Sequence, residues 1–90
     1  MRVLIHKKAL ADMKRIPEQM KAQIKAAIKT LENYPAVRNV RKILGATTVI
    51  DGKKYTPLRL RVGKYRVIFV VVNDTIIIVR VLPRSIAYKR

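Results

Sequence analysis

The spacing of hydrophobic and polar residues divides the chain into a helical first part and a strand-rich second part. The segment of residues 2–6 is short and rich in residue types that favour strands, which predicts a first strand. Residues 7–15 and 17–34 carry apolar positions at helical spacing and predict two helices, with the break at Pro17. The second helix has one apolar stripe, and its members are Met20, Ile24, Ala27, Ile28 and Leu31.

Tight turns divide the second part of the chain. They are Asp51-Gly52, Gly63-Lys64 and Asn73-Asp74, all pairs that suit hairpins. Alternation over residues 58–62 and apolar runs over 65–72 and 75–82 predict three antiparallel strands. Residues 35–41 are expected to form a loop, and residues 42–45 could open a further short strand.

This order of elements predicts an α+β fold. An N-terminal strand and a helical hairpin precede an antiparallel sheet of three to four strands, and the helices should pack on one face of that sheet. Residues 84–90 are expected to be loop or a single turn. Ninety residues leave room for one domain, so residues 1–90 are interpreted as a single unit.

Charge narrows the choice of partners. Lys and Arg number 21 against five Asp and Glu, so the net charge is +16. Such a chain attracts polyanions, and nucleic acid is the first choice over an anionic membrane surface or an acidic protein. The chain has no cysteine and no apolar run of about 20 residues, which suggests a cytoplasmic protein without disulfides and without a membrane span.

Three arginines lie within the strand-forming residues that flank one turn. A two-residue turn at Gly63-Lys64 would place Arg61 directly opposite Arg66 and Arg59 opposite Ile68, all on one face. Like charges in such positions destabilise a sheet. Either these side chains are simply solvated on an uncovered face, or the face binds phosphates.

The position of Arg80 depends on the next turn. A two-residue loop at Asn73-Asp74 would place Arg80 opposite Val67 and away from the other arginines, whereas a three-residue loop would place it opposite Ile68 and beside them. Arg84 follows a proline and could turn towards either face.

Residues 55–89, and most specifically the stretch RLRVGKYR over residues 59–66, resemble the C-terminal half of RelE-type toxins of the RelE/ParE superfamily. The resemblance is closest to archaeal members, and the order of the N-terminal elements agrees with it. It implies the toxin of a type II toxin–antitoxin pair, a ribosome-dependent endoribonuclease that cuts mRNA in the ribosomal A site. In that reaction the ribose 2′-OH attacks the adjacent phosphate and leaves a 2′,3′-cyclic phosphate.

The resemblance also implies the site residues. The catalytic group would comprise Arg59, in place of a family lysine, with Arg66, Arg84 and Tyr88. Where the family carries a second lysine this chain has Pro57, for which Lys53 or Lys54 could substitute in space. The remaining RNA-binding candidates are Arg61, Lys64 and Arg80. The implied partners are mRNA and ribosomal RNA, and an acidic RelB-like antitoxin in a hetero-oligomer.

RNA cleavage needs a base, an acid and stabilisation of the phosphorane. His6, the one histidine, is expected to serve at a strand end or helix entry, and no spacing of ligands indicates a metal or other cofactor. Surrounding cations would favour the phenolate of Tyr88, which could act as the base or stack on an RNA base. Two alternatives are a ParE-like gyrase poison and a non-catalytic module that binds nucleic acid.

Overall fold

The structure is a computed structural model that describes residues 1–87. Its elements are β1 (Arg2–Ile5), α1 (Lys7–Lys14), α2 (Glu18–Thr30), the 3-10 turn η1 (Leu31–Asn33), β2 (Val40–Lys42), β3 (Thr48–Ile50), β4 (Lys53–Tyr55), β5 (Leu58–Val62), β6 (Tyr65–Val72), β7 (Thr75–Pro83) and α3 (Arg84–Ala87). The predicted α+β class and the helical hairpin are confirmed. The second helix is α-helical only as far as Thr30, and a 3-10 turn continues it.

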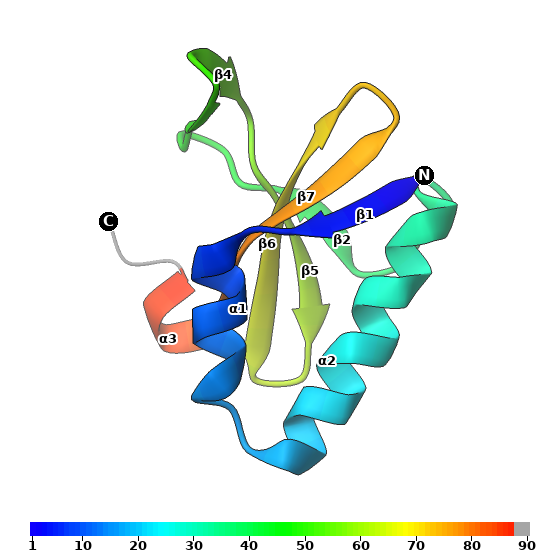
Figure 1. Cartoon of the computed structure of the whole chain (residues 1–90), viewed down its shortest axis with the longest axis vertical. Coiled ribbons are helices and arrows are strands. Elements are labelled where there is room, and N and C mark those ends of the chain that lie inside the picture. The colour runs from blue at the N-terminus through cyan, green and yellow to red at the C-terminus, as the bar shows by residue number, and fades with distance from the viewer. Residues whose placement is uncertain (88–90) are drawn as a thin grey trace.

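The antiparallel part of the main sheet has four strands, within the predicted three to four, and the N-terminal strand joins it as a fifth. The main sheet has five strands in the order β1-β7-β6-β5-β2, and β1 runs parallel to β7 while the other pairs are antiparallel (Figure 1). The loop predicted for residues 35–41 was wrong at its end, because Val40 and Arg41 pair with Leu60 and Arg59 of β5. β3 and β4 form a separate hairpin that projects from the body.

The two hairpin turns have the backbone conformations that their residue types favour. Val62 pairs with Tyr65, so Gly63-Lys64 is the predicted two-residue turn, and the positive φ of Gly63 (57°) suits its first position. Asp51 and Gly52 both have positive φ (48° and 80°), as a type I′ hairpin needs. The Gly63-Lys64 turn sets the register of β5 and β6, which carry Arg59, Arg61 and Arg66, and the Asp51-Gly52 turn sets that of the β3–β4 hairpin.

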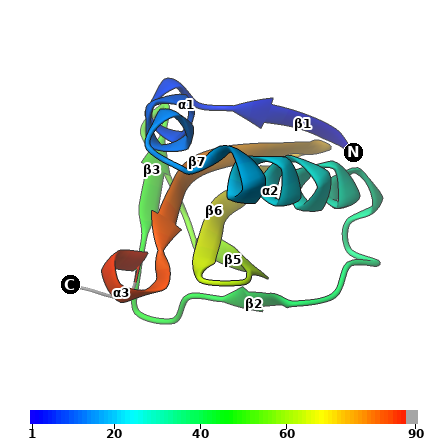
Figure 2. The same cartoon turned by 90° about the horizontal axis from the view of Figure 1, so that it is seen from below.

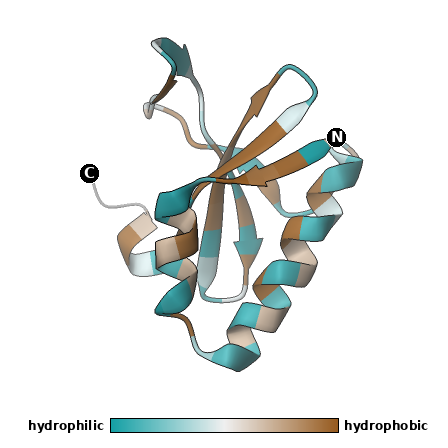
Figure 3. Ribbon diagram, in the orientation of Figure 1, coloured by the Kyte–Doolittle hydropathy of each residue, from teal (hydrophilic) through white to brown (hydrophobic). Residues whose placement is uncertain are grey.

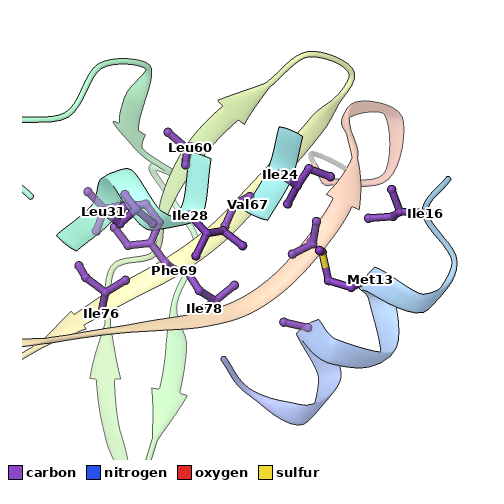
Figure 4. Packing of buried hydrophobic residues seen from close by; sticks show 13 residues of the cluster. Met13, Ile16, Ile24, Ile28, Leu31, Leu60, Val67, Phe69, Ile76 and Ile78 are labelled. Carbon is purple, nitrogen blue, oxygen red and sulfur yellow. The ribbon is translucent and has the colours of Figure 1, made fainter. Parts of the chain in front are cut away.

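The core lies between the helices and one face of the sheet. Ile24 and Ile28 of α2 and Leu31 of η1 point towards β5, β6 and β7, where Phe69 is fully buried (Figure 4). α2 lies against one face of the sheet, and α1 lies at the edge of the sheet beside β7 (Figure 2). Hydrophilic residues cover much of the outer surface of α2 (Figure 3). This packing leaves the opposite face of β5 and β6 without a helix from the hairpin, as the pattern predicted.

β1 pairs with only the first part of β7, and beyond that part α1 lies along the same edge. β1 pairs with β7 as far as Ile78, and the chain then enters α1 at His6. The Nδ1 of His6 accepts a hydrogen bond from the backbone N–H of Lys8 (3.1 Å), which confirms its predicted role at the helix entry. No helix within residues 1–87 is long and apolar enough to cross a membrane.

Candidate nucleic-acid interface

Four arginines form two directly opposed pairs on neighbouring strands. Arg41 of β2 faces Arg59 of β5, and Arg61 of β5 faces Arg66 of β6. Residues directly opposite in an antiparallel pair share a face, and alternate residues of one strand do so too. Leu58 and Leu60 belong to the core, so these four arginines, termed the arginine ladder, belong to the face away from the helices.

A polar cleft of about 290 Å³ opens along part of the ladder, between Asn39 and Arg41 on one side and Arg59 and Arg61 on the other. Asn39 has a positive φ of 65°, and its carbonyl oxygen accepts the backbone N–H of Arg61 (3.0 Å). Its Oδ1 also accepts a hydrogen bond from Nη2 of Arg61 (3.3 Å). The cleft therefore brings three guanidinium groups around one space, and one of them is held by a side-chain amide.

Sequence reasoning missed Arg41. Its strand has only three residues, which is too short for alternation to be recognised. The one available signal was the cluster of basic residues Arg38, Arg41 and Lys42 near Val40, and only the pairing with β5 reveals the face to which Arg41 belongs.

The hairpin turn between β5 and β6 contacts the side chain of Arg66 and the backbone of Arg84. Arg66 is only 6% exposed, and its Nη1 donates to the carbonyl oxygens of Gly63 and Tyr65 (both 2.9 Å). The backbone N–H of Arg84 donates to the carbonyl oxygen of Lys64 (2.8 Å). Arg66 thus differs from the open, solvated arginine that alternation suggested, because the carbonyls of its own turn hold it against the protein.

Arg80 lies on the face of the ladder for a reason that neither predicted loop included. Val72 pairs with Thr75, so the Asn73-Asp74 loop has two residues. An irregularity between Ile68 and Phe69 inserts an extra residue into β7, and Arg80 therefore lies opposite Ile68. The bulge reverses the side of the sheet on which a regular ladder would have placed Arg80.

The guanidinium of Arg80 is bound to α1. Its Nε and Nη2 donate to the two carboxylate oxygens of Asp12 (2.8 and 3.0 Å), and the backbone N–H of Val81 donates to the same carboxylate (2.9 Å). Partial burial acts to raise the pKa of Asp12. The hydrogen bonds from Arg80 and Val81, with the positive charges of Arg80 and Arg15, outweigh burial and lower that pKa below its ordinary value.

The other predicted residues are dispersed. Lys53 and Lys54 belong to β4 of the separate hairpin, and Lys64 is exposed in the turn before Arg66. Pro57 is buried, and its carbonyl oxygen accepts the N–H of Ile43 (2.9 Å). Tyr88 lies outside the described residues, so its place beside Arg84 stays a prediction.

Few carboxylates balance this face. The ion pairs within residues 1–87 join Arg80 to Asp12 and Lys21 to Glu18, and neither includes Arg41 or Arg61. Opposed like charges destabilise a sheet by about 0.2–1 kcal/mol per pair. The described residues also contain no group of three His, Asp or Glu side chains that could hold a metal ion. The chemistry available here is the binding of anions.

Comparison with known proteins identifies the family. Residues 3–88 match the family described as the ParE toxin of the type II toxin–antitoxin system parDE. The chain belongs to this toxin family. Toxin RelE3 of Methanocaldococcus jannaschii is 33% identical over 92 residues, which cover 98% of this chain and 96% of the relative. The predicted resemblance to RelE-type toxins, closest to archaeal members, is confirmed.

Solved structures agree with this assignment. The toxin fold of this chain matches the RelB–RelE antitoxin–toxin complex of Methanococcus jannaschii with a TM-score of 0.71 at 30% identity, covering 96% of this chain and 95% of that one. It matches the archaeal RelE–RelB complex of Pyrococcus horikoshii OT3 with a TM-score of 0.72 at 29% identity, covering 94% and 96%. The ParE-family fold therefore extends over nearly the whole chain.

Proposed function

We propose that this toxin is a ribosome-dependent endoribonuclease that cleaves mRNA in the ribosomal A site and so inhibits translation in the cytoplasm. The observation that carries the proposal is the arginine ladder, in which Arg41 faces Arg59 and Arg61 faces Arg66 on the face away from the helices. Guanidinium groups form charge-assisted, often bidentate hydrogen bonds with phosphates, and such contacts dominate the affinity of proteins for nucleic acid.

The reaction assigns distinct tasks to these groups. The ribose 2′-oxygen loses its proton and bonds to the neighbouring phosphorus, the bond from phosphorus to the 5′-oxygen breaks, and the 5′-oxygen gains a proton. The side chain of Arg66 and the backbone of Arg84 both contact the Gly63–Tyr65 turn, and their guanidinium groups are proposed to stabilise the negative charge that grows on the phosphorane. Arg59 would hold the phosphate, and Tyr88 is the proposed base.

A site of arginines and one tyrosine is a weak acid–base catalyst at neutral pH, because an arginine keeps its proton. We infer that most of the rate comes from the orientation of mRNA by the ribosome, since positioning alone can contribute about 7–11 kcal/mol. Purified toxin should therefore cut free RNA poorly and should cut mRNA on translating ribosomes, as mapped by primer extension. Equal rates on free and ribosome-bound RNA would contradict this mechanism.

Two further measurements separate the alternatives. The double variant Arg84→Ala with Tyr88→Phe should lose mRNA cleavage and growth arrest while it still co-sediments with ribosomes. If growth arrest persists in this variant, the residues are not catalytic and a binding module is the better interpretation. Inhibition of supercoiling by purified gyrase would instead support a gyrase poison.

We also propose that an acidic RelB-like antitoxin binds this chain in a hetero-oligomer, because both archaeal relatives were solved as complexes with RelB. A net charge of +16 favours an acidic partner. A groove of about 420 Å³ between α1 and α2 has apolar walls that include Ile5, Leu10 and Ile28, and lysines border it. Leu10 is 49% exposed, so an amphipathic acidic helix would cover an apolar side chain that water now contacts.

A further inference from the structure

A second pocket of about 300 Å³ lies between the β3–β4 hairpin and the sheet, next to the arginine ladder. Ile50 of the hairpin, Ile68 of β6 and Val79 of the β7 bulge supply apolar walls. Ile68 lies directly opposite Arg59 on one side and Arg80 on the other. The pocket is therefore adjacent to a guanidinium of the ladder and on the same face of the sheet.

The polar residues of the pocket are mainly hydrogen-bond donors. They are His6, Lys8, Thr48 and Arg80. Nδ1 of His6 accepts the N–H of Lys8, so the neutral ring carries its proton on Nε2 and presents a donor there. Lysine and arginine have donors only, and threonine can donate as well as accept. Asp12 binds Nε and Nη2 of Arg80, which fixes the guanidinium in place at the pocket.

This combination suits a nucleobase of a particular kind. Apolar side chains can sandwich the flat ring of an unstacked base. A rim of donors favours a base whose edge presents carbonyl oxygens, such as O4 of uracil or O6 of guanine. Cytosine and adenine present amino donors at the corresponding positions, and the lysine and arginine of the rim cannot accept from them.

We propose that this pocket selects a uracil or guanine next to the phosphate that the ladder holds, and that it contributes to the sequence preference of the toxin. The proposal rests on the proposed function in that its ligand is RNA. Lys8 and Thr48 are the specificity residues, while Arg59 holds the phosphate of the same or an adjacent nucleotide.

The test uses short 2′-O-methyl oligouridine and oligocytidine carrying a fluorescent label. The methyl group blocks the attacking oxygen, so binding is measured without cleavage. The two probes differ at the 4-position of the ring and in the protonation of N3, while the backbone is the same. By fluorescence anisotropy, the wild-type chain should bind oligouridine about fivefold more tightly, the value of one net hydrogen bond. Lys8→Ala and Thr48→Val should each bring this ratio towards one.

Lys7→Ala is the matched control, because Lys7 is the exposed neighbour in the same helix, carries the same charge and does not line the pocket. This variant should weaken the binding of both probes equally and leave the ratio of their affinities unchanged. Equal binding of the two probes by the wild type, or the same loss of ratio in Lys7→Ala as in Lys8→Ala, would overturn the proposal. If the wild type prefers oligouridine as expected but does not cleave mRNA on ribosomes, the proposed base selectivity of the pocket is supported and the proposed nuclease function is wrong.

Discussion

The carboxylate of Asp12 joins α1 to the part of β7 that β1 does not reach. Asp12→Ala removes a bidentate bond to Arg80 and leaves the N–H of Val81, a residue that is 2% exposed, without its acceptor. Both losses are expected to act in the same direction, so this single change tests how strongly the helix is held at the edge of the sheet.

The expected loss in the free energy of unfolding follows from how far each group is exposed to solvent. The side chain of Arg80 is 44% exposed and that of Asp12 is 11% exposed, so the ion pair is partly screened and should contribute about 1 kcal/mol. A buried N–H that loses its partner costs about 1–2 kcal/mol. We therefore expect Asp12→Ala to lower the free energy of unfolding by about 2–3 kcal/mol, as measured by urea denaturation followed by circular dichroism. Glu18→Ala is the control, because Glu18 is 88% exposed in its own ion pair and should cost about 0.5 kcal/mol.

The pH dependence gives an independent test of the same contact. The pKa of Asp12 is lower in the folded chain than its unfolded value of about 3.9, so the stabilisation is complete above that value. It is lost as the pH falls through the lower, folded pKa. The difference in stability between wild type and Asp12→Ala should therefore be constant near neutral pH and should shrink below about pH 4. A difference that stays the same into strong acid, or one no larger than that of Glu18→Ala, would refute the reasoning.

Two further predictions concern the binding surfaces. Arg41→Ala should weaken binding of single-stranded RNA about tenfold and reduce the slope of log affinity against log salt by about 0.7, whereas Lys42→Ala, the same charge change on the opposite face of β2, should do less. Equal effects in these filter-binding titrations would mean that net charge alone matters. In the α1–α2 groove, Leu10→Ser should weaken the antitoxin complex about fivefold by calorimetry, and Leu44→Ser, an exposed leucine outside the groove, should not. Similar losses in both would exclude the groove as the docking site.

Much of the fold and the centre of the ladder could be predicted because local chemistry determines them. The Gly63-Lys64 turn sets the pairing of Arg61 with Arg66, and the stripe at Ile24 and Ile28 determines which face of α2 is buried. In each case the decisive residues lie within a few positions of one another. Turn geometry and helical periodicity are short-range properties, and one sequence displays them directly.

Other features depend on contacts between residues far apart in the chain. Arg80 and Asp12 are 68 positions apart, and nothing local indicates that α1 supplies its carboxylate. The bulge at Val79 contains no glycine that would indicate it, so counting from the turn left the side of Arg80 open. Arg41 became visible only through its pairing with Arg59. The burial of Arg66 by the carbonyls of its own turn likewise requires three-dimensional geometry.

The parallel pairing of β1 with β7 also affects when the protein can complete its fold during synthesis. Residues 2–5 find their ladder partners only in residues 75–78, so the first strand stays unpaired until those residues have been made. Contacts between segments so distant in sequence form late, because the chain must close a long loop first. The sheet is therefore completed only after β7 has been made, and a partner that binds earlier meets a chain whose first strand is still unpaired.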